Sequence, residues 1–139
     1  MKVNMNRSLI LVFGMIFSLS LVSACGSSKK KVIESYTEDG VTVTAYGSKG
    51  HFKKGNNSFI LKFKKDGKPF DAGKNVKFNF HMVAMPPNMP PMTNDITISP
   101  TKKLGVYKGE GKLQMSGNWT VNIEYGDGKT MAFSISARK

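Results

Sequence analysis

The feature that most restricts the fold of this chain is a strict alternation of apolar and polar side chains in several short runs. In residues 75–82, Val76, Phe78 and Phe80 alternate with polar neighbours, and residues 118–125 repeat the pattern. An alternation of period two places one set of side chains on each face of a β-strand. The chain is therefore predicted to form strands that are buried on one face.

Turn signals separate these runs, among them Asp66-Gly67 and the glycines at positions 126 and 128. The predicted strands are residues 41–46, 58–64, 75–82, 95–99, 105–108 with 112–114, 118–125 and 129–137. Gly109 and Gly111 are expected to interrupt the fifth of them, and residues 47–57 to form a loop. Many short strands without a helix favour an all-β fold, an immunoglobulin-like antiparallel β-sandwich of about seven strands. Trp119 and Tyr107 are expected in its core.

Residues 81–92 (His-Met-Val-Ala-Met-Pro-Pro-Asn-Met-Pro-Pro-Met) hold four of the nine methionines and four of the six prolines. The prolines exclude a helix because they lack the N–H donor and clash with the preceding turn. They favour extended polyproline II, which has about three residues per turn. That geometry predicts a stiff loop in which Met85 shares a face with Met82, and Met92 with Met89.

Methionine thioethers are soft ligands that suit Cu(I), and they bind it without losing a proton. The candidate ligands are Met85, Met89 and Met92, and either His81 or Met115 is a candidate to complete the site. Methionine is also a flexible filler of apolar gaps and an adaptable contact for other proteins. A plug at the end of the sandwich and a protein-binding surface therefore remain alternatives to a metal site.

The alternation of side chains along a strand places His81 and Met82, the first two residues of this run, on opposite faces. If the strand over residues 75–82 is regular, Met82 points inward with Phe78 and Phe80, and His81 points outward. Met82 is therefore predicted to belong to the core. His81 and Met82 cannot then bind one metal ion together unless a bulge intervenes or the strand ends early.

The first 24 residues are typical of a signal peptide, with Lys2 and Arg7 before an uncharged run at positions 9–22. The run is shorter than the roughly 17–25 residues of a bilayer span. Leu21-Val22-Ser23-Ala24-Cys25 resembles the bacterial lipobox, in which the cysteine is lipidated. The predicted organisation is a signal peptide (1–24), a lipidated Cys25 with a tether (25–37) and a domain (38–139). This organisation predicts an anchor on the outer face of the cell membrane.

The charge balance is strongly basic. Without Lys2 and Arg7, nineteen basic residues face nine acidic ones, a net charge of +10. An exported protein rarely meets nucleic acid, so no nucleic-acid partner is expected. Anionic lipid headgroups or wall polymers are better counterparts, and a solvated lysine-rich surface is an equally simple explanation.

The sequence carries no motif of a known catalytic class. A nucleophile elbow, a zinc-protease His-Glu pair and a phosphate-binding glycine loop are all missing. Two histidines, His51 and His81, are too few for a typical catalytic zinc site. Because Asp95 is the only carboxylate near the methionines, a calcium site is disfavoured as well. We therefore expect a binding protein rather than an enzyme.

Several short segments together resemble the YtkA-like family. They are Gly67-Lys68-Pro69, Gly73-Lys74-Asn75-Val76, the methionine–proline run, Gly105-Val106-Tyr107 and Met115-Ser116-Gly117-Asn118-Trp119. The resemblance spans roughly residues 40–137 by strand count. It implies a small extracytoplasmic domain, frequently a lipoprotein, related to modules beside copper-handling and oxidase-maturation proteins.

Between Met85 and Met89, the chain departs from the compact Met-Pro-x-Met of many family members, because Pro86-Pro87-Asn88 lengthens this gap. The resemblance and the thioethers together predict Cu(I) binding for copper handling or oxidase maturation. The alternative is a metal-free accessory domain that binds another protein or an anionic surface polymer.

Overall fold

The computed structural model describes residues 29–139, in which all regular structure is β. The nine strands are β1 (Lys31–Glu38), β2 (Val41–Gly47), β3 (Gly55–Lys65), β4 (Lys68–Pro69), β5 (Lys77–Met82), β6 (Met92–Pro100), β7 (Val106–Leu113), β8 (Gly117–Tyr125) and β9 (Lys129–Ala137). Each strand pairs antiparallel with its neighbours. The prediction of an antiparallel all-β fold is confirmed.

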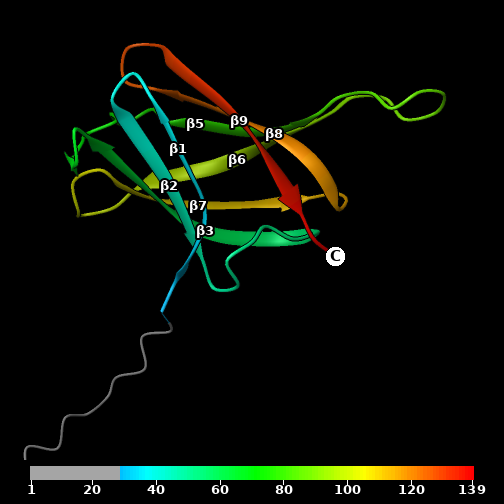
Figure 1. Ribbon diagram of the computed structural model, residues 1–139, viewed down its shortest axis with the longest axis horizontal. Coiled ribbons are helices and arrows are strands. Elements are labelled where there is room, and N and C mark those ends of the chain that lie inside the picture. The colour runs from blue at the N-terminus through cyan, green and yellow to red at the C-terminus, as the bar shows by residue number, and fades with distance from the viewer. Residues whose placement is uncertain (1–28) are drawn as a thin grey trace, which may run out of the picture.

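The strands follow the order β1-β2-β3-β7-β6-β5-β8-β9, with β4 beside β3. The sheet folds over on itself (Figure 1), because β6 pairs with β5 through residues 92–96 and with β7 through residues 97–100. The two edge strands approach each other where the rings of Tyr36 in β1 and Phe133 in β9 stack at 5.1 Å. The result is a sandwich that is nearly closed into a barrel.

The core fills the space between the two halves of the folded sheet. Aromatic rings from the two halves meet in it, and those of Phe59 in β3 and Phe78 in β5 lie 5.2 Å apart. Trp119 in β8 is only 1% exposed. Tyr107 is buried too, as expected. All buried hydrophobic residues in the described part of the chain lie between positions 41 and 137. Residues 29–139 therefore carry the whole of this packed core.

Strand β1 occupies a segment that the sequence assigns to the tether. It pairs with β2 from Lys31 opposite Gly47 to Glu38 opposite Val41. Its register shifts between Val32 and Glu34, and this irregularity lets both Ile33 and Tyr36 pack against the core although they lie three residues apart. The same shift breaks the period of two, so alternation alone does not reveal this strand.

Strand β7 runs unbroken through the two glycines that were expected to interrupt it. The ring of Phe59 occupies the space that a side chain at Gly109 would fill, and Ile96 does the same at Gly111. These glycines let large core residues approach the backbone rather than ending the strand. Strand β3 likewise begins at Gly55, inside the expected loop 47–57. With β1 and the two-residue β4, the count rises from about seven to nine.

The segment between β4 and β5 is fastened to β7 by one buried phenol. The hydroxyl of Tyr107 donates a hydrogen bond to the carbonyl of Gly73 at 2.8 Å and lies 3.3 Å from Oδ1 of Asp71. Burial raises the pKa of Tyr107 above its ordinary value, and the negative charge of Asp71 raises this pKa further. The phenol is therefore held in its neutral, donating form.

Candidate functional site

Residues 83–91 continue β5 and β6 beyond the body of the sandwich as a narrow two-stranded projection, here called the methionine arm (Figure 1). The N–H of Met85 donates to the carbonyl of Met89 at 3.0 Å, and the N–H of Met89 donates back to Met85 at 3.1 Å. Residues 86–88 form the turn at the tip. Because the four prolines lie in the turn and on the strand that returns from it, their missing N–H groups cost no sheet pairing.

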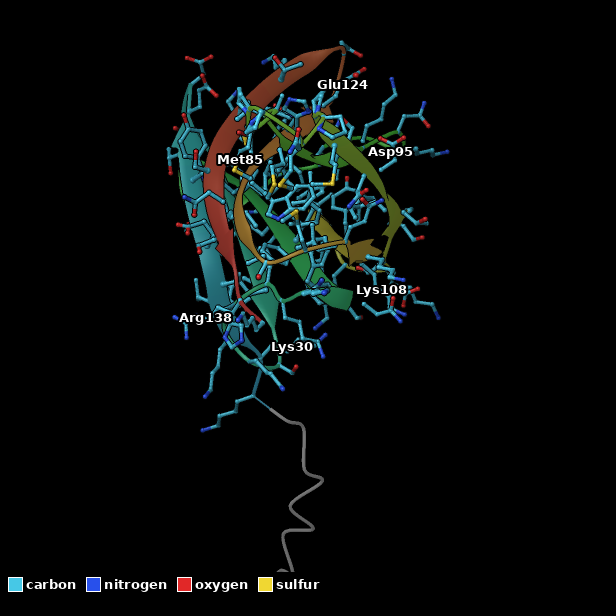
Figure 2. The ribbon with its side chains drawn as sticks, turned by 90° about the vertical axis from the view of Figure 1, so that its right-hand side faces the viewer. Lys30, Met85, Asp95, Lys108, Glu124 and Arg138 are labelled. Carbon is cyan, nitrogen blue, oxygen red and sulfur yellow. The ribbon has the colours of Figure 1, made fainter. Side chains whose placement is uncertain are left out.

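Met85 and Met89 form what we call the tip pair. Two residues that exchange both hydrogen bonds lie directly opposite each other, with Cα atoms about 5.5 Å apart and side chains on the same side of the hairpin. Met85 is 44% exposed, and Met89 is half-buried (Met85 is labelled in Figure 2). Two thioethers therefore leave the same side of the arm, and one of them is open to solvent.

A second pair of methionines lies where the arm joins the sandwich. Met82 is opposite Met92 in the β5–β6 register, and we call these two residues the root pair. Met82 is only 3% exposed, and Met92 packs against the core. The methyl carbon of Met82 lies 3.4 Å from the place of a Cβ on Gly117. The side chain of Met82 therefore extends toward the turn between β7 and β8.

Met115 belongs to that same turn, at the root of the arm. Its side chain packs against the core, and its carbonyl accepts a hydrogen bond from the indole N–H of Trp119 at 3.2 Å. Met115 is therefore fixed at the end of the sandwich beneath the arm, on the side toward which Met82 points.

The five predicted ligands do not form one cluster. The tip pair lies three positions from the root pair along each strand, which corresponds to about 10 Å of extended chain. Met85 and Met89 lie together at the tip, whereas Met92 and Met115 lie at the root. Of the predicted set, the tip pair is the combination that the backbone places side by side.

His81 lies on the outer face of β5, as the alternation in the sequence predicts. Phe80 and Met82 are buried on the inner face, while His81 is half-buried on the outer face. The Nδ1 atom of His81 lies 3.0 Å from Oγ1 of Thr93 on β6. His81 therefore belongs to the outer surface of the sheet, on the opposite face from the root pair.

The polyproline II prediction for the faces of these methionines is wrong. It placed Met85 with Met82 and Met89 with Met92, whereas the hairpin pairs Met85 with Met89 and Met82 with Met92. The spacings of three, four and three residues are symmetric about Pro87, and such symmetry puts both pairs in register once the chain reverses there. That symmetry is the signal that would have revealed the pairing.

The arm offers soft donors and no charge. Residues 83–91 contain no ionisable side chain. Within residues 29–139, no three His, Cys, Asp or Glu side chains gather as a metal site. Thioethers are therefore the metal-binding chemistry that the arm presents, and such ligands select soft ions over calcium or magnesium.

The family profile of YtkA-like proteins matches residues 35–124, well over half of the chain. The chain belongs to the YtkA-like family. A search of curated proteins and a search of solved structures gave no match. The region that matches the YtkA-like family begins inside β1, ends inside β8 and contains the whole methionine arm with its root pair.

Two expectations about the membrane concern residues outside this domain. The predicted signal peptide and Cys25 lie outside the residues that the structure describes. Between positions 29 and 139, the chain forms no helix of the length and apolarity needed to cross a bilayer.

Proposed function

We propose that this YtkA-like protein is an extracytoplasmic lipoprotein that binds Cu(I) through its methionine arm, in copper handling or oxidase maturation. One observation carries the proposal: backbone hydrogen bonds place Met85 and Met89 directly opposite each other on a narrow, uncharged projection. Paired soft donors suit a soft monovalent cation. Copper is a cargo of the protein in this proposal, and no reaction is assigned to it.

The exposure of the tip suits a site that binds Cu(I) and passes it on. A site meant to exchange its ion must remain accessible to a donor or acceptor protein, and Met85 is 44% exposed. The sandwich anchors both strands of the arm through the register of β5 with β6, so the tip is presented on a rigid base. Met82 has a structural role in this proposal because it is buried at the root, and Met92 lies with it in the root pair, away from the tip pair.

The test is a competition against a chromogenic Cu(I) chelator under reducing conditions, using residues 29–139. Wild type is expected to hold one Cu(I), and Met85→Leu with Met89→Leu to release it. Leucine is close in volume to methionine, so each replacement costs less than about 1.5 kcal/mol and leaves the fold intact while removing the sulfur. Met92→Leu alone is expected to weaken the site less than the loss of the tip pair.

The matched control is Met131→Leu, the same replacement at a buried methionine of β9 within the core. It is expected to retain Cu(I) as wild type does. If wild type cannot compete with the chelator, or if the control loses copper as the tip variant does, the tip pair is not a copper site. His81→Ala extends the series, and its outward position predicts a smaller effect than that of the tip pair.

The second candidate function is a metal-free accessory domain that binds another protein through the arm. The observation that favours it is the exposure of apolar side chains there, because Val83 is 66% and Met85 44% exposed. Exposed apolar groups on a projecting element are suited to insertion into a partner. Failure of wild type to bind Cu(I), together with a partner whose binding is lost in Val83→Ser, would favour this function.

Two further parts of the proposal concern fold type and location. We assign the sandwich to the immunoglobulin-like type, supported by its antiparallel halves and the tryptophan buried between them. We also propose lipidation of Cys25 and attachment to the outer face of the cell membrane. The support for this attachment is the signal-peptide pattern of residues 1–24 and the segment before Cys25 that resembles a lipobox.

A further inference from the structure

Basic side chains from three separate segments meet at one end of the sandwich. We call this the basic end, and its members are Lys29, Lys30, Lys31, Lys49, Lys53, Lys54, Arg138 and Lys139. All are exposed except Lys53, which is half-buried. Figure 2 shows Lys30 and Arg138 at this end of the molecule, and Asp95 and Glu124 at the opposite end.

Backbone contacts hold these segments together. The N–H of Lys54 donates to the carbonyl of Arg138 at 2.7 Å, and the N–H of Arg138 donates to the carbonyl of Phe52 at 2.9 Å. Those two bonds tie the last residues to the loop between β2 and β3. The same loop touches β1, because a Cβ at Gly50 would lie 3.2 Å from Cβ of Lys31. The cations are thus gathered by the fold and not merely by a run in the sequence.

Among residues 29–139, no acidic side chain pairs with the cations of the basic end. The three segments contain no acidic residue, and Glu34 on β1 is the nearest in sequence. Within the described domain the ion pairs are Lys77–Glu124 and Lys108–Glu110, so none of the eight cations has a carboxylate partner there. Asp39, Asp66 and Asp127 occupy turns at the other end of β1, β3 and β8. The domain therefore has a charge asymmetry along its strands.

We propose that the basic end binds the anionic headgroups of a lipid bilayer and sets the orientation of the domain on the membrane. Clustered Lys and Arg side chains are attracted to anionic bilayers within about a Debye length, roughly 8 Å at physiological salt. A lipid surface is favoured over a soluble polymer because the residues that follow Cys25, the proposed site of lipidation, join the domain at the basic end. Lys29 lies four residues after Cys25, a reach of at most about 14 Å.

The orientation has a consequence for the arm. In Figure 1 the arm projects sideways from the sandwich and not toward the start of β1 or the β2–β3 loop. With the basic end against the headgroups, the tip pair lies above the membrane and points along its plane. The proposed orientation depends in part on the proposed lipid anchor at Cys25, whereas the cluster of basic side chains is independent of copper and of lipidation.

The experiment measures binding of residues 29–139, which lack Cys25, to vesicles of phosphatidylglycerol mixed with phosphatidylcholine. Each Lys or Arg near an anionic surface strengthens binding about fivefold, so neutralising three of them is expected to weaken it on the order of 100-fold. The test variant is Lys49→Gln, Lys54→Gln and Arg138→Gln. Wild-type binding is expected to fall steeply as salt is added, and to be lost on pure phosphatidylcholine.

The matched control removes three charges elsewhere: Lys64→Gln, Lys68→Gln and Lys129→Gln, all exposed near the opposite end. It has the same net charge as the test variant and is expected to bind within about fivefold of wild type. Equal losses in the two variants would show that net charge acts without a docking end, and would overturn the proposal. Absence of wild-type binding at low salt would overturn it too.

A soluble polyglycerol phosphate distinguishes the source of the phosphate. It is expected to bind residues 29–139 more weakly than vesicles that present the same concentration of phosphate. Tighter binding to the soluble polymer would assign the basic end to a wall polymer instead of a bilayer. Because no arm residue changes in these variants, their Cu(I) competition should match wild type, which keeps this test separate from that of the copper site.

Discussion

Replacing Gly109 with alanine tests the close packing that lets β7 run unbroken. Gly109 is buried, and its neighbour across the sheet is Phe59 of β3. A methyl group at position 109 would overlap the ring of Phe59. The backbone of Gly109 does not have a positive φ, so alanine is compatible with the local conformation and the effect depends on packing alone.

The ring of Phe59 has little freedom to move away. It is 1% exposed and meets the ring of Phe52 edge-on at 5.2 Å and that of Phe78 at 5.2 Å. Overpacking of this kind costs about 1–3 kcal/mol. Replacing glycine with alanine also stabilises the folded state by about 0.4–1 kcal/mol, because alanine lowers the conformational entropy of the unfolded chain. The expected net loss is therefore about 1–2 kcal/mol, or several degrees in Tm at about 4–8 °C per kcal/mol.

The assay is urea and thermal unfolding of residues 29–139, with Lys112→Ala as control on an exposed position of the same strand. The control is expected to change stability by less than about 0.5 kcal/mol. Phe59→Leu should make room for the methyl, so the double variant should lose at least about 0.5 kcal/mol less than the sum of the single losses. A Gly109→Ala variant that is more stable than wild type would refute the packing argument.

Two further predictions concern the anchor and the buried phenol. Full-length protein made in a bacterium with lipoprotein processing should partition into the detergent phase, whereas Cys25→Ser should not; identical partitioning would contradict the lipid anchor. Folding raises the pKa of Tyr107 above its ordinary value of 10.0. The stability that the neutral phenol contributes is therefore complete below pH 10.0 and is lost as the pH rises through the pKa of the folded state. Tyr107→Phe should cost about 1 kcal/mol at neutral pH, because the Gly73 carbonyl loses its donor. It should then lose less stability than wild type in urea unfolding above pH 10, and equal losses would contradict the assignment.

Strands buried by simple alternation were predictable from sequence. Residues 129–137 are β9 as expected, and β8 begins one residue before the predicted start at position 118. In these strands every second side chain enters the core, so local pattern and tertiary packing agree. Strand β1 escaped prediction because an irregular register brings Ile33 and Tyr36 to the core three residues apart.

For the methionine arm, the sequence predicted the candidate residues but not how they pair. Its composition identified the candidate thioethers, but proline chemistry gave the wrong partners for Met85 and Met89. Local preference for polyproline II is weak compared with the register that β5 and β6 impose from the sheet below. The clustering of charges at the basic end could not be predicted from the sequence either. It depends on contacts between distant segments, such as the hydrogen bond from the N–H of Lys54 to the carbonyl of Arg138, more than eighty residues away.

Strand β1 is both the first strand of the domain and an edge of its sheet, so a mechanical load entering through the chain before Lys31 acts on it first. Lys31 lies at the open end of the β1–β2 hairpin, whose closed end is the turn at Asp39 and Gly40. A pull along the strand axis loads the hydrogen bonds of this hairpin together, in shear. A pull away from the sheet opens them one after another, and the stacked rings of Tyr36 and Phe133 resist that peeling. The force that the domain withstands is therefore set by the direction of the load.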